Sequence, residues 1–245
     1  GINHFLYRKG KLTNLSSIYI ASDKLIYSAG IGGFGLWEKN EYGRFEYTSL
    51  HYVAPTKEDY LQPTFNNIVS HENQMVFKSQ DQLFFFDPKD GSIKTLKAPE
   101  YYKNIFKTSS HLLFSDFQGS IYTIQGDDMA FFEDFKQIRS ELINIFEIAQ
   151  NDFVFIFKNG QVWSKKGTLT RNIVNLKSIV INAAIQNKND EIVIGTNQNG
   201  IYILDNQYRP KKTIIDTDDL RSNYVKGLYE DAQENLWAIG DKEIH

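Results

Sequence analysis

The sequence predicts an all-β protein, a β-propeller of about six four-stranded antiparallel blades. Short apolar segments bounded by polar turns recur along the whole chain, and their first residues lie roughly 37 to 50 positions apart, the period of a propeller blade. A second apolar segment follows about 8 or 9 residues after each start, as in a β-hairpin. The first series is 25–30, 75–78, 112–115, 153–156, 192–195 and 236–239, and the second is 34–37, 83–86, 121–124, 162–164 and 201–204.

The composition supports strands. The chain of 245 residues contains 18 Phe and 14 Tyr, and aromatic side chains suit the half-buried surface of a pleated sheet. A chain of this length fits one repeat domain. We therefore expect a single propeller domain over residues 1–245, with complete blades at about 16–50, 64–98, 102–136, 142–174 and 178–215.

A sixth blade is expected to be composite. Residues 220–245 would supply its inner two strands and residues 1–15 its outer two, which closes a ring and leaves no open sheet edge. The alternative is a piece of a larger, for example seven-bladed, propeller that stays open or is closed by a neighbouring chain. Since the chain opens at Gly1 in the middle of a motif, we expect an excised fragment.

Two local features refine this pattern. Residues 87–91 read as the turn of a β-hairpin. The segment 129–142 is the least regular, and Phe131, Phe135 and Ile138 recur there at helical spacing, which suggests a short helix.

Charge and composition exclude several function classes. The formal net charge is -3, from 27 basic and 30 acidic residues without blocks of one sign, so no binding of nucleic acid or of an anionic membrane is expected. The chain has no cysteine, which excludes disulfides, thiol catalysis and thiolate metal sites. No apolar run approaches the roughly 18 residues of a membrane span, and the N-terminus lacks a signal-like pattern.

The last repeat resembles the two-component regulator propeller repeat. It carries Ser-Asn-Tyr-Val at 222–225, Tyr-Glu-Asp at 229–231 and Asn-Leu-Trp-Ala-Ile-Gly at 235–240. The segment 192–205 resembles the continuation of that repeat, and segments 34–43 and 47–50 are similar to early blades of such sensors in Bacteroidetes. Glu234 stands where the family usually has a turn glycine, and Ala238 interrupts its tryptophan-isoleucine-glycine-threonine run.

This resemblance implies the periplasmic sensor domain of a hybrid two-component or LuxR-type regulator. Such proteins carry a membrane span and a histidine kinase or a helix-turn-helix regulator beyond the propeller, and some hybrid kinases sense products of polysaccharide breakdown. It implies a carbohydrate-sensing role in signal transduction, with an oligosaccharide ligand and a second propeller copy as partners. Contact with nucleic acid or a membrane is not expected of this segment.

One glycine-rich motif has a structural explanation. Residues 30–35 fit G-x-G-x-x-G after a strand, but a dinucleotide site needs a helix next, and residues 36–39 read as a strand. The glycines are better explained by positive φ in a turn between two strands. No cofactor is therefore expected.

No metal site or catalytic residue is expected either. The acidic run 216–219 has no EF-hand glycine or distal glutamate, so it reads as a solvated loop. The histidines have no ligand spacing, and the tryptophans are expected to pack between blades rather than to form a sugar platform. These residues are His4, His51, His71, His111 and His245, and Trp37, Trp163 and Trp237.

Ligand binding is expected at loops between the second and third strands of the blades, because propellers bind ligands at loops near the central channel. Their amide, carboxylate and cationic groups can hydrogen-bond sugar hydroxyls and shift a conformational equilibrium that reaches an output domain. The candidate ligand-binding residues in these loops are Gln80, Asp81, Asp116, Gln118, Lys158, Asn159, Asn197 and Asn199. Arg221 and Tyr224 are expected near the same face, in the loop that enters the sixth blade.

Two other classes stay open beside this non-enzymatic sensor. A glycan-cleaving propeller enzyme would need two or more convergent carboxylates with shifted pKa values. A protein-interaction scaffold would instead show an exposed aromatic patch and no deep pocket.

Overall fold

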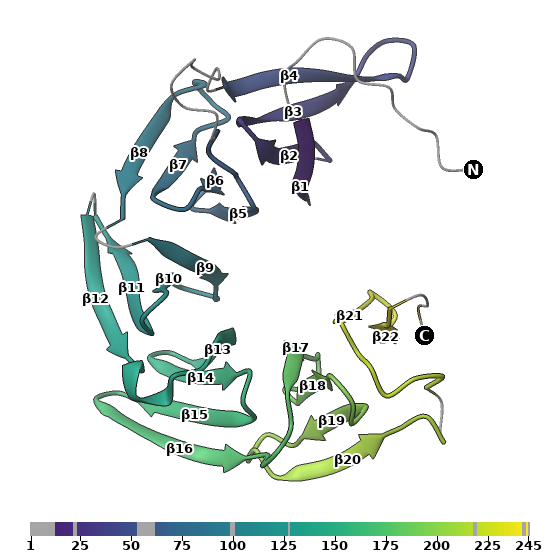
Figure 1. The fold of residues 1–245 in the computed structure, drawn as a ribbon. Helices are drawn as coiled ribbons and strands as arrows, with labels where there is room; N and C mark the ends of the chain where they lie inside the picture. Colours follow the sequence, from purple (N-terminus) through teal and green to yellow (C-terminus); the bar gives the residue numbers. More distant parts are fainter. Residues whose placement is uncertain are drawn as a thin grey trace. The chain divides into compact units, whose positions relative to one another are not determined.

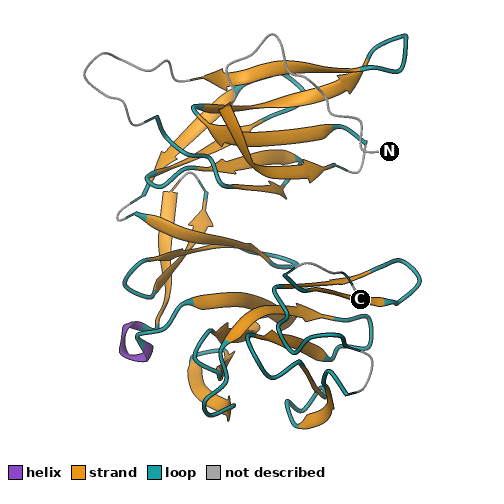
Figure 2. Ribbon diagram, turned by 45° about the vertical axis from the view of Figure 1, so that its right-hand side comes forward, coloured by secondary structure: helices purple, strands orange, loops and turns teal. Residues whose placement is uncertain are grey.

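The computed structural model describes residues 13–21, 24–52, 62–98, 101–126, 128–217, 220–241 and 244. These residues form five four-stranded sheets and one two-stranded sheet, and within each sheet consecutive strands are neighbours (Figure 1). The helical part of the described chain is a single 3-10 turn, η1 (Lys136–Ile138), coloured purple in Figure 2. The chain divides into two compact units, which are described separately below.

Unit 1 contains Gly1–Lys107, Phe114–Phe117 and Ile124–Ala130. Its first two sheets are antiparallel hairpin stacks in sequence order. The first sheet is β1 (Thr13–Ile20), β2 (Ile26–Ile31), β3 (Gly33–Lys39) and β4 (Phe45–Tyr52), and the second is β5 (Asn67–His71), β6 (Gln74–Lys78), β7 (Gln82–Phe86) and β8 (Ile93–Lys97).

The third sheet contributes strands to both units. It consists of β9 (Tyr102–Lys107), β10 (Leu112–Asp116), β11 (Ser120–Gln125) and β12 (Asp128–Asp134).

Unit 2 contains Thr108–Leu113, Gln118–Thr123 and Phe131–His245. Its strands are antiparallel and follow the same order. The fourth sheet is β13 (Leu142–Ala149), β14 (Asp152–Phe157), β15 (Gln161–Lys166) and β16 (Leu169–Asn175), the fifth is β17 (Ile181–Gln186), β18 (Ile192–Thr196), β19 (Ile201–Leu204) and β20 (Pro210–Ile214), and the sixth is β21 (Gly227–Glu230) with β22 (Leu236–Ile239).

Each unit has a core between successive sheets. In unit 1 the ring of Phe34 in the first sheet stacks on that of Phe77 in the second, with ring centroids 3.9 Å apart. In unit 2 Val154 and Val162 of the fourth sheet share a cluster with Ile194 of the fifth. Such burial of apolar faces is what a four-stranded sheet alone cannot provide, so neighbouring sheets stabilise one another.

Both predicted series of strands are confirmed. Every segment of the first series lies in the second strand of a sheet, apart from Leu25 at an edge, and every segment of the second series lies in a third strand. In the sixth sheet 236–239 is β22, the second of the two described strands. In the first sheet β1 is one continuous strand, and its Thr13 and Leu15 pair with Ile31 and Gly30 of β2. The hairpin turn at 87–91 is also confirmed, since the N–H of Gly91 donates to the carbonyl oxygen of Asp87.

The short helix expected over 129–142 is largely wrong. Its first part is strand β12, its end begins β13, and only η1 is helical. Phe131 is 63% exposed whereas Phe135 is buried, so these residues do not share one helical face. Residues 1–12, which the composite blade requires, lie outside the described residues, and that blade stays a prediction.

Turns between the second and third strands, here called second turns, connect each sheet to the next one. The carbonyl oxygen of Gln80 accepts a hydrogen bond from the N–H of Tyr102, at 2.6 Å, where β9 begins. Corresponding bonds run from Gly32 N–H to Pro63 O, from Ile181 N–H to Lys158 O and from Val225 N–H to Thr196 O, at 2.8 to 2.9 Å. Second turns are therefore structural joints within each unit.

Ser115 on β10 has a buried hydroxyl with no hydrogen-bond partner among the described residues. Because an unpaired buried hydroxyl is destabilising, Ser115→Ala should raise the free energy of unfolding by about 1 kcal/mol, measured by urea denaturation. Ser28→Ala is the control, because the Ser28 Oγ accepts a 2.8 Å hydrogen bond from Trp37 Nε1 and its loss should be destabilising. A loss of stability in Ser115→Ala would contradict the prediction.

Candidate functional site

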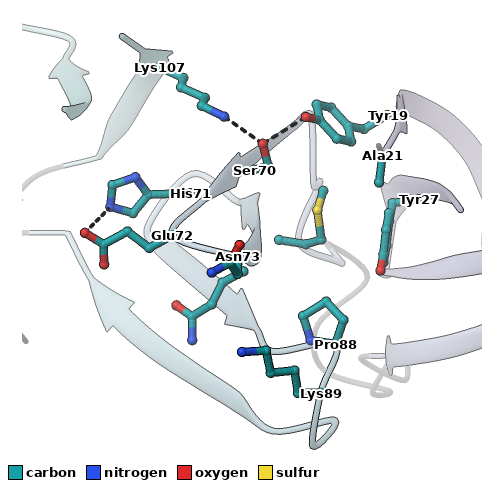
Figure 3. Close-up of a pocket in the computed structure, with 12 residues that line it drawn as sticks. Tyr19, Ala21, Tyr27, Ser70, His71, Glu72, Asn73, Pro88, Lys89 and Lys107 are labelled. Carbon is teal, nitrogen blue, oxygen red and sulfur yellow. Dashed lines mark hydrogen bonds and ion pairs between the residues drawn. The ribbon is translucent and has the colours of Figure 1, made fainter. Parts of the chain in front are cut away.

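A pocket of about 760 Å³ opens in unit 1, at the ends of strands from three successive sheets (Figure 3). Volumes of this size are typical of small-molecule sites. The strand ends β1, β5 and β9 meet here, together with the β5–β6 and β7–β8 turns. The lining residues are Tyr19, Ala21, Tyr27, Ser70, His71, Glu72, Asn73, Gln74, Met75, Pro88, Lys89 and Lys107.

Ser70 is the centre of a polar chain on one wall of the pocket. The Lys107 ammonium donates to the Ser70 Oγ at 2.8 Å, and the Tyr19 hydroxyl lies 2.9 Å from the same oxygen. Figure 3 shows the two side chains reaching Ser70 from opposite sides. The wall therefore joins one residue from each of three sheets, separated by 51 and 37 positions in the sequence.

The floor of the pocket is apolar and fixed by the core. Tyr27 is 1% exposed, and its ring packs against Phe77 and Phe86 with centroid distances of 6.2 and 6.3 Å. Met75 beside it is 4% exposed. At these exposures the two side chains shape the base of the pocket but give a ligand almost no surface of their own to contact.

The β5–β6 turn forms the rim. Glu72 and Asn73 both have positive φ, 46° and 66°, as in the tight two-residue turns that match the twist of a hairpin. His71 and Gln74 pair across its base. The turn thus presents short polar side chains at the mouth of the pocket in a restrained backbone.

His71 contributes a titratable group to this rim. Burial lowers its pKa below the usual value, Glu72 raises it, and the charge of Lys107 lowers it further. The His71 Nε2 lies 3.9 Å from a carboxylate oxygen of Glu72, whose side chain is 84% exposed. His71 is therefore held mainly neutral at pH 7, where it can both donate and accept hydrogen bonds.

A second polar cluster lies in unit 2, where the β9–β10 turn surrounds Glu147 of β13. The Glu147 carboxylate is 2% exposed and accepts hydrogen bonds from the hydroxyls of Thr108, Ser109 and Ser110 and from the Ser110 N–H. Burial tends to raise the pKa of Glu147, but these hydrogen bonds, from Ser110 first, lower it to about 2.

This cluster contains a serine, a histidine and a carboxylate without the geometry of a catalytic triad. The Ser110 Oγ lies 2.9 Å from Nδ1 of His111, and Glu147 lies 3.4 Å from the same nitrogen. A triad needs the nucleophile and the carboxylate on different ring nitrogens, so that the ring carries the proton from one side to the other. The arrangement instead fixes the β9–β10 turn to β13, the first strand of the fourth sheet.

In unit 1 the predicted ligand residues belong to a second turn. Gln80 is exposed, and the carbonyl oxygen of Asp81 accepts from Ala98 N–H at 2.8 Å while its carboxylate accepts from Ser79 Oγ at 3.0 Å. Asp116 is 5% exposed at the end of β10. These residues lie at the end of their strands opposite to the pocket, since β6 begins at Gln74 on the pocket and ends before Ser79.

In unit 2 the remaining predicted residues lie in second turns, apart from Arg221 and Tyr224, which lie between β20 and β21. Lys158 donates to a carboxylate oxygen of Glu141 at 3.1 Å, and Asn159 accepts from the N–H of Gln161 at 3.3 Å. Asn197 donates its N–H to Val180 O, and Asn199 donates its N–H to Thr196 Oγ1. Gln118 and Arg221 are exposed, and Tyr224 is half-buried. Ligand binding by these ten residues stays a prediction.

The glycine-rich motif, His51 and Trp163 contribute to turns and to packing within the fold. The G-x-G-x-x-G motif forms the β2–β3 turn, where Gly32 has φ of 85°, as expected. His51 packs between the rings of Phe34 and Phe84, and burial lowers its pKa. The ring of Trp163 in the fourth sheet packs against Phe135, which follows the third.

The indole N–H of Trp37 donates to Ser28 of its own sheet, and the indole N–H of Trp237 donates to the carboxylate of Asp231 in its own hairpin. His4, His245, Asp218 and Asp219 lie outside the described residues. Among the residues with described positions, no three of His, Asp and Glu gather as metal ligands. Within the same residues no helix has the length and hydropathy to cross a membrane.

The pocket itself was not anticipated from the sequence. Its polar residues stand singly in strand ends and tight turns, and only the fold brings them together. The one sequence signal is the pair of polar residues Glu72 and Asn73 at the tip of a short hairpin, which marks a surface turn but no ligand.

The sequence matches no family model and no curated protein. The structure, however, matches the extracellular domain of the putative one-component system BT4673 from B. thetaiotaomicron over 98% of this chain, with a TM-score of 0.73 and 14% identity. The WD40 β-propeller domain of Doa1 matches over 96% of this chain, with a TM-score of 0.57 and 12% identity. The chain has a β-propeller fold.

The propeller also matches a catalytically inactive virginiamycin B lyase from Staphylococcus aureus with quinupristin, at a TM-score of 0.70 and 15% identity, over 97% of this chain and 80% of the lyase. The chain described here spans 33% of the length of the BT4673 chain and 93% of that of the Doa1 chain. The match to BT4673 agrees with the sequence resemblance to sensor propellers at the level of the fold. Because one fold serves both a sensor and a lyase, function has to be argued from the site.

Proposed function

We propose that this propeller is the non-catalytic, ligand-binding part of an extracytoplasmic sensor in a signal-transduction regulator, and that its unit 1 pocket binds an oligosaccharide. The pocket is the observation that carries the proposal, because hydroxyl, amide and ammonium groups from several strand ends and turns gather on its walls. Such groups can donate hydrogen bonds to sugar hydroxyls, and the hydroxyl and amide groups can also accept them. The match to an extracellular domain supports a location outside the cytoplasm, which we propose to be the periplasm.

Signalling would proceed through a population shift. A ligand that bridges Tyr19, Ser70 and Lys107 contacts three sheets at once, and so favours whichever arrangement of these sheets best fits it. Two copies of the propeller would pass this preference to an output domain beyond the chain. The strength of the signal is limited by the difference in ligand affinity between the two arrangements.

The same pocket offers little for glycan hydrolysis. Glycosidases commonly place two carboxylates on either side of the scissile bond. Among the described residues that line this pocket, only Glu72 carries a carboxylate, and its side chain is 84% exposed. The pocket therefore favours binding over cleavage.

The proposal is tested by titrating the full chain with a panel of neutral and acidic oligosaccharides, monitored by calorimetry and by analysis of the products. Ala21→Trp places a large ring in the pocket and should weaken binding at least about tenfold, because it occupies space that the ligand needs. Lys97→Gln on β8, an exposed lysine outside the pocket, is the control and should leave affinity within about twofold.

The double variant Asn197→Ala/Asn199→Ala tests the second-turn residues as the competing site. Loss of binding in this variant with full binding in Ala21→Trp would overturn the pocket assignment. Cleaved products in the mixture would favour the enzyme class, and absence of both binding and cleavage would leave the protein-interaction scaffold.

A further inference from the structure

We propose that the unit 1 pocket selects ligands bearing an anionic group, a carboxylate or a sulfate, over neutral ligands of the same shape. This inference rests on the proposed function and specifies the ligand class. It follows from a count of hydrogen-bond donors and of charges around Ser70.

The three residues of the polar wall have more donor hydrogens than they use. The Lys107 ammonium has three N–H groups and donates one of them to Ser70. Tyr19 and Ser70 have one hydroxyl hydrogen each, and their mutual hydrogen bond uses one of the two. Whichever hydroxyl donates, the other hydroxyl hydrogen and two ammonium hydrogens remain for a ligand, so the wall can donate several hydrogen bonds to an acceptor-rich group.

The charged side chains around the pocket also favour an anionic ligand. Lys89 in the β7–β8 turn and Lys107 at the end of β9 lie on two different elements that both line the pocket. Figure 3 shows both lysines beside the pocket, on opposite sides of the β5–β6 turn. Among the described residues of the lining, the opposing charge is that of Glu72, which is 84% exposed and lies near His71. The net charge of these described residues is therefore positive.

The position of the Lys107 ammonium strengthens this preference. Hydrogen bonds between an ammonium and a carboxylate are about twice as strong as those between neutral groups. Lys107 is held toward Ser70 in advance, so less side-chain entropy is lost when an anion binds.

The experiment compares trigalacturonic acid with its methyl ester, which has the same skeleton without the negative charges. Calorimetry on the full chain should show binding of the acid at least about tenfold tighter than that of the ester, the ratio for one charge-assisted contact. Lys107→Gln should weaken the acid about tenfold and the ester less than twofold. Lys97→Gln, with the same change of charge outside the pocket, should weaken neither ligand.

A gain of affinity provides a test that misfolding cannot imitate. Glu72→Gln removes the carboxylate from the rim and should tighten binding of the acid about twofold, an effect of the size expected for an exposed charge. Its melting temperature and that of Lys107→Gln should stay near that of the unmodified chain.

Three outcomes would overturn the inference. Equal binding of the acid and the ester, both weakened by Ala21→Trp, would retain the proposed oligosaccharide site and remove its charge preference. Inorganic phosphate binding to the pocket as tightly as the trimer would identify a site for free anions. Absence of binding for the acid, while a neutral glycan of the panel binds, would refute the anionic class alone, and no binding by any glycan would refute the proposed function as well.

Discussion

Replacing Gly160 by alanine should lower the free energy of unfolding by at least about 3 kcal/mol, because two separate costs add at this position. Gly160 has φ of 84°, a conformation in which a side chain is strained. A Cβ atom would also lie 2.2 Å from the carbonyl oxygen of Leu176, which is backbone and cannot rotate away. The N–H of Leu176 donates to the Gly160 carbonyl at 2.9 Å, so relief of the clash would break this bond. Urea denaturation of both proteins measures the difference.

Gly167 in the next turn of the same sheet is the matched control. It has φ of 58°, and a Cβ atom there would have no neighbour within 4 Å. Gly167→Ala should therefore cost only about 1 kcal/mol, the conformational part of the effect. Equal losses in the two variants would show that the contact with Leu176 contributes nothing.

Replacing Glu147 by glutamine should cost about 3 kcal/mol, because a buried carboxylate that accepts four hydrogen bonds loses its charge and one acceptor oxygen. The carboxylate accepts from Thr108 Oγ1 at 2.6 Å and from Ser109 Oγ and Ser110 N–H at 2.9 Å. A glutamine has one acceptor oxygen, and its amide would face hydroxyl groups that are already donors. Chemical denaturation at pH 7 measures the loss.

The pH dependence of stability tests the same cluster in another way. Since the pKa of Glu147 is lowered to about 2 in the folded protein, its contribution is fully present above the ordinary glutamate pKa and is lost as the pH falls toward 2. The Glu147→Gln variant should show a shallower fall in this window. Glu41→Gln, an exposed carboxylate in the β3–β4 turn, should leave the profile unchanged, and a parallel profile for Glu147→Gln would contradict the assignment.

The strands could be predicted because their signal is local. An apolar run such as 153–156 between polar turns determines a buried strand whatever lies around it, and the repeat spacing determines which strands form one sheet. The segment 129–134 was misjudged because Phe131 and Phe135, four residues apart, suggest one face of a helix. In the structure Phe131 is exposed on β12 and Phe135 follows that strand, buried against Phe155.

The pocket could not be predicted, because its wall depends on contacts between sheets. Tyr19, Ser70 and Lys107 each look like an ordinary strand-end residue, and only the packing of three sheets in unit 1 brings them within 3 Å. The second turns were predicted to bind a ligand because their side chains are polar. In the structure their backbone groups form hydrogen bonds that join one sheet to the next. Glu147 was missed for the same reason, although the run of Thr108, Ser109 and Ser110 in one turn is a local sign of a buried acceptor.

The joints at second turns have a consequence for how such a protein can change over evolution. Backbone hydrogen bonds such as Ile181 N–H to Lys158 O constrain one end of the strands, so insertions there would separate neighbouring sheets. The tip Glu72–Asn73, at the other end, carries no joint of this kind in the structure described, whereas the β9–β10 turn is bound to Glu147 of the next sheet. The Glu72–Asn73 tip can therefore accept a longer or different loop at little cost in stability, which makes it the natural place to graft a new specificity onto an unchanged scaffold.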